Sequence, residues 1–106
     1  MPESLPIRYT SSAVNDLDLI FGYISVENKA AAYELVSDME AAVMGLSEMP
    51  YMGSVVNPEV RTNISGLRYV VVAPYVIFYV LQQDEVVIAR VLHSRQDWLH
   101  LLFIGF

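Results

Sequence analysis

The cationic side chains in the second half of the sequence are its first candidates for a functional role. Four of the six Lys and Arg residues lie there, and two of them fall in the run Arg90-Val-Leu-His-Ser-Arg-Gln-Asp-Trp98, beside an imidazole and the one tryptophan. Guanidinium groups bind carboxylates and phosphates through paired hydrogen bonds. The sequence therefore predicts a local cationic face that contacts a partner, built from Arg61, Arg68, Arg90 and Arg95.

The overall charge restricts the chemical class of that partner. The 106-residue chain has a formal net charge of −6, and most of its acids lie in the first half. Nonspecific nucleic-acid binding depends on Lys and Arg neutralising phosphates, so this balance disfavours direct binding of nucleic acid. The chain has no cysteines, and His93 and His100 are isolated, so we expect no disulfide, metal or cofactor. A protein partner is the favoured interpretation.

Each candidate residue also has a purely structural interpretation. Arg68 would either contact a partner or pair with an acid of the helices, and the sequence does not separate these alternatives. For Arg95 we favour a partner contact over an ion pair with Asp97. For His93 we favour a role in capping a turn. For Trp98 we favour a place in the core over a role as an interface anchor.

Two helices must precede and support these residues. Apolar residues recur at steps of three and four over residues 12–26, and again from Ala32 to Leu46. Asn28 is a good N-cap for the second helix, which should end near residues 45–47. Because the break between the helices is short, they should form an antiparallel hairpin. Residues 5–10 alternate apolar and polar side chains and predict a short strand, which Pro6 places at a sheet edge or a strand start.

The second half of the sequence predicts an antiparallel sheet. Residues 67–73, 75–81 and 86–92 are rich in Val, Ile, Tyr and Phe, with Pro74 and the polar residues 82–85 between them. We expect Tyr75 and Tyr79 to pack across strands rather than stack on a base. Residues 49–59 are typical of a surface loop, and residues 96–103 of a short final helix. These strands are almost continuously apolar, which indicates that both sheet faces are covered. The hairpin would cover one face, and the other would await a partner or remain poorly covered.

The length and composition favour one α+β domain spanning residues 1–106, in the order β-α-α-β-β-β. Hydrophobic residues make up 55% of the chain, so part of the apolar surface is expected to meet a partner. The longest apolar run, residues 69–81, is too short to span a bilayer and contains Pro74. The N-terminus lacks the features of a signal peptide, and a cytoplasmic location is expected.

Motifs over almost the whole chain resemble those of the RelE/ParE toxin superfamily. They are Ala13-x-x-Asp16-Leu17, Asn28-x-x-Ala31-Ala32, Met49-Pro50-x-x-Gly53, Leu67-Arg68, Pro74-Tyr75-x-Ile77-x-Tyr79 and the run from Arg90 to Trp98. The last two, in this order, are the most specific, and they resemble ParE-like or plasmid-stabilisation toxins.

The resemblance implies the toxin of a bacterial type II toxin–antitoxin system, which a cognate antitoxin wraps and holds inactive. In this superfamily ParE members inhibit DNA gyrase by binding, whereas RelE members cut messenger RNA in the ribosome. RelE-like enzymes usually carry a cation in the strand that here spans residues 75–79, tend to be strongly basic, and often use a C-terminal Tyr or His. This chain departs from all three patterns. We therefore favour a ParE-like toxin that acts by binding, not as an enzyme, with a ParD-like antitoxin as its partner.

Two alternatives stay open at this stage. A RelE-like ribonuclease would need an acid–base set and a cation, which Glu59, Arg68 and His93 could supply. A degenerate, non-toxic relative would only bind its partner. Under the favoured hypothesis the antitoxin forms a hetero-oligomer by laying a helix or an extended segment on apolar surface. Contacts to the target or antitoxin would then come from Arg61, Arg68, Arg90, Arg95, Trp98, Leu99, Leu102 and Phe103.

Overall fold

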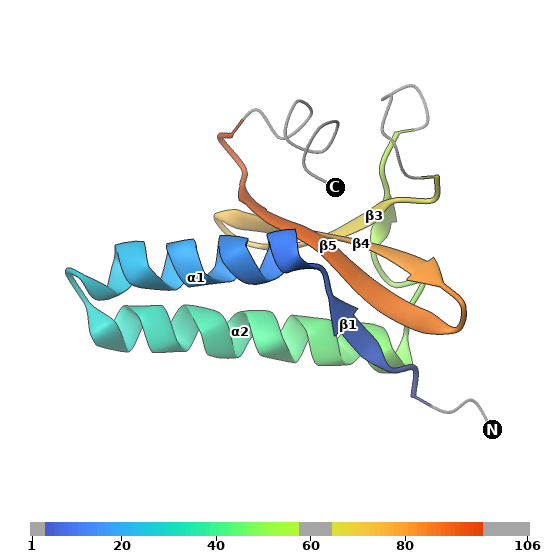
Figure 1. Cartoon of the computed structure of the whole chain (residues 1–106), viewed down its shortest axis with the longest axis horizontal. Helices are drawn as coiled ribbons and strands as arrows, with labels where there is room; N and C mark the ends of the chain where they lie inside the picture. Colours follow the sequence, from blue (N-terminus) through green and yellow to red (C-terminus); the bar gives the residue numbers. More distant parts are fainter. Residues whose placement is uncertain (1–3, 58–64, 97–106) are drawn as a thin grey trace.

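The computed structural model describes residues 4–57 and 65–96, in which two helices pack on one face of a five-stranded sheet (Figure 1). This is the α+β fold that the sequence predicts. The helices are α1 (Ser11–Ser25) and α2 (Lys29–Glu48). The strands are β1 (Ile7–Tyr9), β2 (Ser54–Val55), β3 (Arg68–Val72), β4 (Tyr75–Gln82) and β5 (Glu85–His93).

The helical hairpin forms as predicted, and side-chain caps set where its helices begin. The Asn28 side chain accepts a hydrogen bond from the backbone N–H of Ala31 at 3.0 Å and starts α2. The cap of α1 is Thr10, the residue directly before the helix. Its hydroxyl accepts from the N–H of Ala13 at 3.0 Å and donates to the carbonyl of Ala89 at 2.7 Å. Thr10 therefore joins the start of α1 to β5.

The sheet has the strand order β1-β5-β4-β3-β2, and its pairings among β2, β3, β4 and β5 are antiparallel. The antiparallel pairing predicted for the strands of the second half is confirmed, whereas β1, whose direction the sequence left open, pairs with β5 in parallel. Strand direction there is set by the hairpins that orient β5, far along the chain, and the local alternation in residues 5–10 carries no information about it. The sheet is therefore mixed, with β1 at one edge, where Pro6 predicts it.

A β-bulge in β5 decides which of its side chains face the helices. Phe78 pairs with Arg90 and Tyr79 with Ile88, so Ala89 is an extra residue without a partner in β4. As a result both Ile88 and Val91 point into the core beneath the helices. That core also contains Ala13 from α1, Met39, Val43 and Leu46 from α2, and Ile77 and Tyr79 from β4.

The opposite face of the sheet carries a second buried cluster. Its members are at most 8% exposed: Val56, Leu67, Phe78, Val80, Val87, Ala89 and Leu92. The expectation that this face would await a partner or remain poorly covered is therefore wrong for these side chains. Val56 directly follows β2, and Leu67 directly precedes β3. Both side chains belong to this cluster, so it includes residues outside the strands.

The interpretation of Tyr75 and Tyr79 as packing residues is confirmed, because both belong to the core beneath the helices. The short final helix expected over residues 96–103 lies almost entirely outside the described residues. In the part of the chain that the structure describes, no helix is long and apolar enough to cross a membrane.

Candidate functional site

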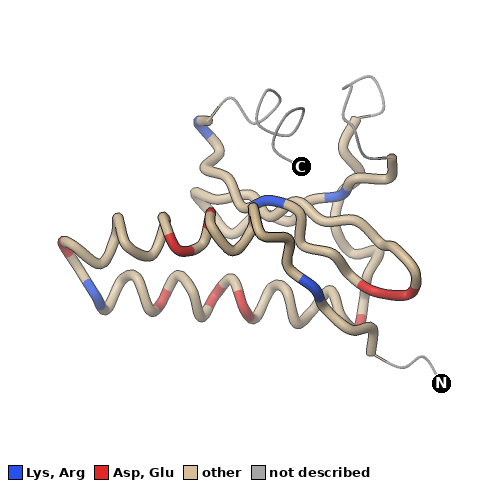
Figure 2. Tube along the Cα trace, in the orientation of Figure 1, with Lys and Arg blue, Asp and Glu red and all other residues tan. Residues whose placement is uncertain are grey.

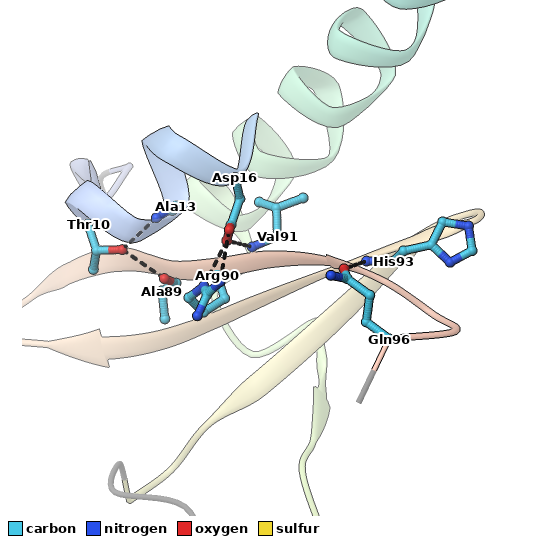
Figure 3. Close-up of polar contacts among 8 residues, drawn as sticks. All are labelled: Thr10, Ala13, Asp16, Ala89, Arg90, Val91, His93 and Gln96. Atoms are coloured by element: carbon cyan, nitrogen blue, oxygen red, sulfur yellow. Dashed lines mark hydrogen bonds and ion pairs between the residues drawn. The ribbon is translucent and has the colours of Figure 1, made fainter. Parts of the chain in front are cut away.

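A largely buried ion pair joins Asp16 of α1 to Arg90 of β5. The carboxylate accepts from Arg90 Nε at 2.8 Å and from Arg90 Nη2 at 2.9 Å (Figure 3). The same carboxylate accepts from the backbone N–H of Val91 at 2.9 Å. The two side chains are only 9% and 12% exposed. Hydrogen bonding to Asp16 raises the pKa of Arg90 above its ordinary value, against the opposing effect of burial.

This contact gives Arg90 a structural role that the sequence prediction did not include. β1 ends at Tyr9, so β5 continues beyond its parallel neighbour. There the Thr10 hydroxyl satisfies the Ala89 carbonyl, and Asp16 satisfies the Val91 N–H (Figure 3). At the bulge, side chains of Thr10 and α1 thus supply the hydrogen-bond partners that a neighbouring strand would otherwise provide. The guanidinium of Arg90 is held against α1, away from the exposed cationic face for which the sequence suggested it.

Arg68 holds the loop before β2 in place. Its Nη1 donates to the carbonyl oxygens of Gly53 at 2.9 Å and Tyr51 at 3.3 Å. Its guanidinium carbon lies 5.0 Å from the centre of the Tyr51 ring, in cation–π range. The two alternatives drawn from the sequence were a partner contact and an ion pair with a helix acid. The observed contacts are to backbone carbonyls, which no charge pattern in the sequence indicates.

The buried hydroxyl of Tyr79 also holds this loop through two hydrogen bonds. It donates to the carbonyl of Pro50 at 2.8 Å and accepts from the N–H of Gly53 at 2.9 Å. Burial raises the pKa of Tyr79, so the phenol is neutral and able to donate at physiological pH. Only glycine fits at position 53, because a Cβ there would lie 2.8 Å from the carbonyl oxygen of Tyr69.

His93 closes the turn at the end of β5, as its favoured interpretation predicts. Its Nδ1 accepts from the N–H of Arg95 at 3.0 Å. Its own backbone N–H donates to Gln96 Oε1 at 2.7 Å (Figure 3). Its ring meets the edge of Tyr75 at 5.3 Å between centroids. Arg95 is exposed beside this turn, so the prediction that it contacts a partner stays a prediction.

The candidate catalytic residues Arg68 and His93 lie far apart. Arg68 is opposite Tyr79, which is opposite Ile88, and His93 lies five positions beyond Ile88 along β5. With strands about 4.8 Å apart and a rise of about 3.3 Å per residue, the two Cα atoms are separated by about 15–20 Å. In the structure each side chain is engaged locally, Arg68 with the loop before β2 and His93 with its own turn. Six further predicted site residues lie outside the described ranges: Glu59, Arg61, Trp98, Leu99, Leu102 and Phe103.

A pocket between the two helices is a feature that the sequence did not predict. It has a volume of about 290 Å³ and opens between α1 and α2 above the sheet. Its walls and floor are mainly aliphatic: Val14, Leu17, Val36, Met39, Val43, Ile77, Ile88 and Val91. Asp18 of α1 and Glu40 of α2 also line it, and both are exposed. Figure 2 shows acidic residues at several places along both helices.

Tyr9 of β1 completes the pocket lining. Burial, together with the nearby charge of Glu40, raises the pKa of its phenol, which therefore stays neutral beside the carboxylates. A signal for the pocket was present in the sequence. Val14 extends the apolar stripe of α1 toward solvent, and it is 47% exposed in the structure.

Comparisons with known proteins place this geometry in a family. A family model described as the ParE toxin of the type II toxin–antitoxin system parDE matches residues 7–98. A protein of Sinorhizobium fredii (strain NBRC 101917 / NGR234) named "Putative toxin Y4kP" is 35% identical over 98 residues, which cover 91% of this chain and 95% of that protein.

Two solved structures have similar folds. A chain of the chromosomal ParDE system from P. aeruginosa aligns with a TM-score of 0.67 at 20% identity, covering 85% of this chain and 96% of that one. A chain of the toxin–antitoxin complex RelBE2 from Mycobacterium tuberculosis aligns with a TM-score of 0.55 at 26% identity, covering 85% and 98%. The resemblance inferred from the motifs is confirmed, and the chain belongs to the family of ParE toxins of type II toxin–antitoxin systems.

Proposed function

We propose that this toxin acts by binding DNA gyrase, not by cutting RNA, and that a ParD-like antitoxin holds it inactive. The family match supports a toxin of this class. Both similar solved structures are described as toxin–antitoxin systems or complexes, which supports an antitoxin as the partner. The net charge of −6 also favours protein partners over ribosomal RNA.

The separation of Arg68 from His93 is the observation that carries the choice of binding over catalysis. General acid–base cleavage requires its groups within hydrogen-bond reach of one reacting phosphate. These two side chains lie at separate places on β3 and β5, and each already serves a local turn or loop. The arrangement supports a toxin that works through its surface. Arg61, Arg95 and the segment from Trp98 to Phe103 stay our candidates for contacts with the target or antitoxin.

Two assays on the same purified chain test the proposal. In the first, the chain is titrated into a DNA gyrase reaction, and supercoiled and cleaved plasmid are quantified. In the second, it is added to translating ribosomes, and messenger RNA ends are mapped by primer extension. We expect loss of supercoiling with intact messenger RNA. Ribosome-dependent cleavage without an effect on gyrase would instead support a RelE-like ribonuclease. No effect in either assay would support a non-toxic relative.

The protein encoded beside the toxin gene is the natural control in the gyrase assay. A small upstream reading frame with a ribbon–helix–helix pattern would be the candidate antitoxin. Adding it in equimolar amount should restore supercoiling, because the antitoxin competes with the target for the free toxin. A pre-formed complex should have no effect on gyrase.

A further inference from the structure

The pocket between α1 and α2 is an exposed apolar site with a charged rim. Its floor is formed by buried core residues, among them Met39, Ile77 and Ile88, whereas Val14 at its mouth is 47% exposed. At about 290 Å³ it falls just below the range of roughly 300–1,000 Å³ that is usual for small-molecule sites. The volume suits one or two apolar side chains of another protein better than a cofactor.

The charge around the pocket has one sign. Asp18 and Glu40 stand on the two helices that border it. Residues 11–48, which span both helices, contain Lys29 as their one cation and seven acids. One of these acids, Asp16, is already paired with Arg90. A partner segment that enters the pocket therefore meets an uncompensated negative rim.

We propose that the pocket receives an apolar anchor side chain of the antitoxin, flanked by Lys or Arg residues that pair with Asp18 and Glu40. The inference rests on the proposed function, because the occupant is the antitoxin. It places an acidic surface beside the cationic residues that the sequence offered for contacts with a partner. Two of those cations, Arg68 and Arg90, are engaged within the fold, and the exposed charge beside the pocket is negative.

The anchor and the charges act together. An apolar side chain that fills the mouth removes water from Val14 and its neighbours, which favours binding through apolar burial. The same exclusion of water lowers the local dielectric constant around Asp18 and Glu40 and strengthens their attraction to a cation. Charge complementarity also speeds association and selects against acidic partners. A ligand without both elements would bind weakly.

Substitutions at the rim test the charge component. The probe is the protein encoded beside the toxin gene, titrated by calorimetry into the full-length toxin at low and high salt. We expect the double variant Asp18→Asn/Glu40→Gln to weaken binding at least tenfold at low salt and to flatten the salt dependence. The matched control is Glu34→Gln/Asp38→Asn, which removes two exposed charges from α2 outside the pocket. We expect the control to change affinity less than threefold.

A bulky substitution tests the apolar component. Val14→Trp should fill the mouth of the pocket and weaken binding more than tenfold. Leu19→Trp adds the same side chain to α1 at a position that is 65% exposed and does not line the pocket. This control should bind normally. Circular dichroism and thermal unfolding of each variant establish that the fold is kept before affinities are compared.

The outcomes separate this inference from the proposed function. Tight antitoxin binding that is unchanged in both the rim and the Val14→Trp variants would overturn the pocket proposal and leave the toxin assignment intact. An outcome in which only the control variants bind the antitoxin more weakly would also overturn it. Absence of any binding by the unmodified toxin would contradict both. The gyrase assay on the free toxin does not involve the antitoxin, so it reports on the target independently.

Discussion

Replacing Asp16 by alanine should cost this fold a large part of its stability. The substitution removes the acceptor for Arg90 Nε, Arg90 Nη2 and the Val91 N–H at once. It leaves a guanidinium that is 12% exposed without its counter-charge. Removing one partner of a buried ion pair typically costs about 3–5 kcal/mol. Because domains of this size are stabilised by about 5–15 kcal/mol in total, the variant should be close to its unfolding threshold.

Urea unfolding followed by far-ultraviolet circular dichroism measures this loss. We expect the midpoint to fall sharply at an unchanged slope, and the thermal midpoint to fall by more than about 10 °C. Asp16→Asn is the milder variant. It keeps an oxygen for the Val91 N–H but removes the charge, and we expect it to cost about 1.5–3 kcal/mol.

The exposed ion pair between Arg8 and Glu85 is the matched control. Its Nε–Oε1 distance is also 2.8 Å, but its side chains are 53% and 26% exposed. Because exposed pairs contribute little, Glu85→Gln should cost less than about 1 kcal/mol. The reasoning about the buried pair is refuted if Asp16→Ala and Glu85→Gln destabilise the protein equally, or if Asp16→Ala costs less than about 1 kcal/mol.

Other predictions concern the loop before β2 and the buried phenols. Gly53→Ala should lower the free energy of unfolding by about 1–3 kcal/mol through overpacking. Gly45→Ala, whose Cβ would have ordinary contacts only, should be neutral or stabilising. Tyr79→Phe should cost about 1–3 kcal/mol, because two loop backbone groups lose their partner. Burial raises the pKa values of Tyr9, Tyr75 and Tyr79. Their contribution to stability is complete below about pH 10 and should be lost as pH rises through the raised values.

Urea unfolding of each variant checks the first two of these predictions. Equal stability of the two alanine variants would contradict the steric argument. A Tyr79→Phe variant as stable as the unmodified protein would contradict the hydrogen-bonding argument. Unfolding at several pH values, with phenol ionisation followed by absorbance near 295 nm, checks the third. The alkaline prediction fails if stability stays constant from about pH 9 to 11.

The helices were predictable from the sequence because their signals are local. The three- and four-residue spacing of apolar side chains and the Asn28 cap both act within a few residues, and the observed α2 begins directly after Asn28. The strand pattern likewise predicted β3, β4 and β5. The parallel pairing of β1 was not predicted, because its neighbour β5 lies almost eighty residues away and local alternation carries no direction.

The site residues were harder to assign because their partners are distant or uncharged. Arg90 was taken as a surface cation, and its actual partner, Asp16, is 74 positions away. Arg68 binds backbone carbonyls, which every residue possesses and no sequence pattern distinguishes. The role of His93 was predicted correctly, because a turn cap involves neighbours only two and three residues away.

The pocket also escaped prediction for a physical reason. It exists because α1 and α2 leave a space above the bulged strand β5, and that spacing depends on packing between three elements. The sequence shows Asp18 and Glu40 only as two acids among many. Their position on opposite sides of one opening emerges after folding.

The gyrase supercoiling reaction is the measurement that tests the proposed function most directly. The free chain should abolish formation of supercoiled plasmid in proportion to its concentration, and an equimolar amount of the neighbouring antitoxin should restore it. Full supercoiling in the presence of a large excess of folded toxin, together with cleavage of ribosome-bound messenger RNA, would contradict the account.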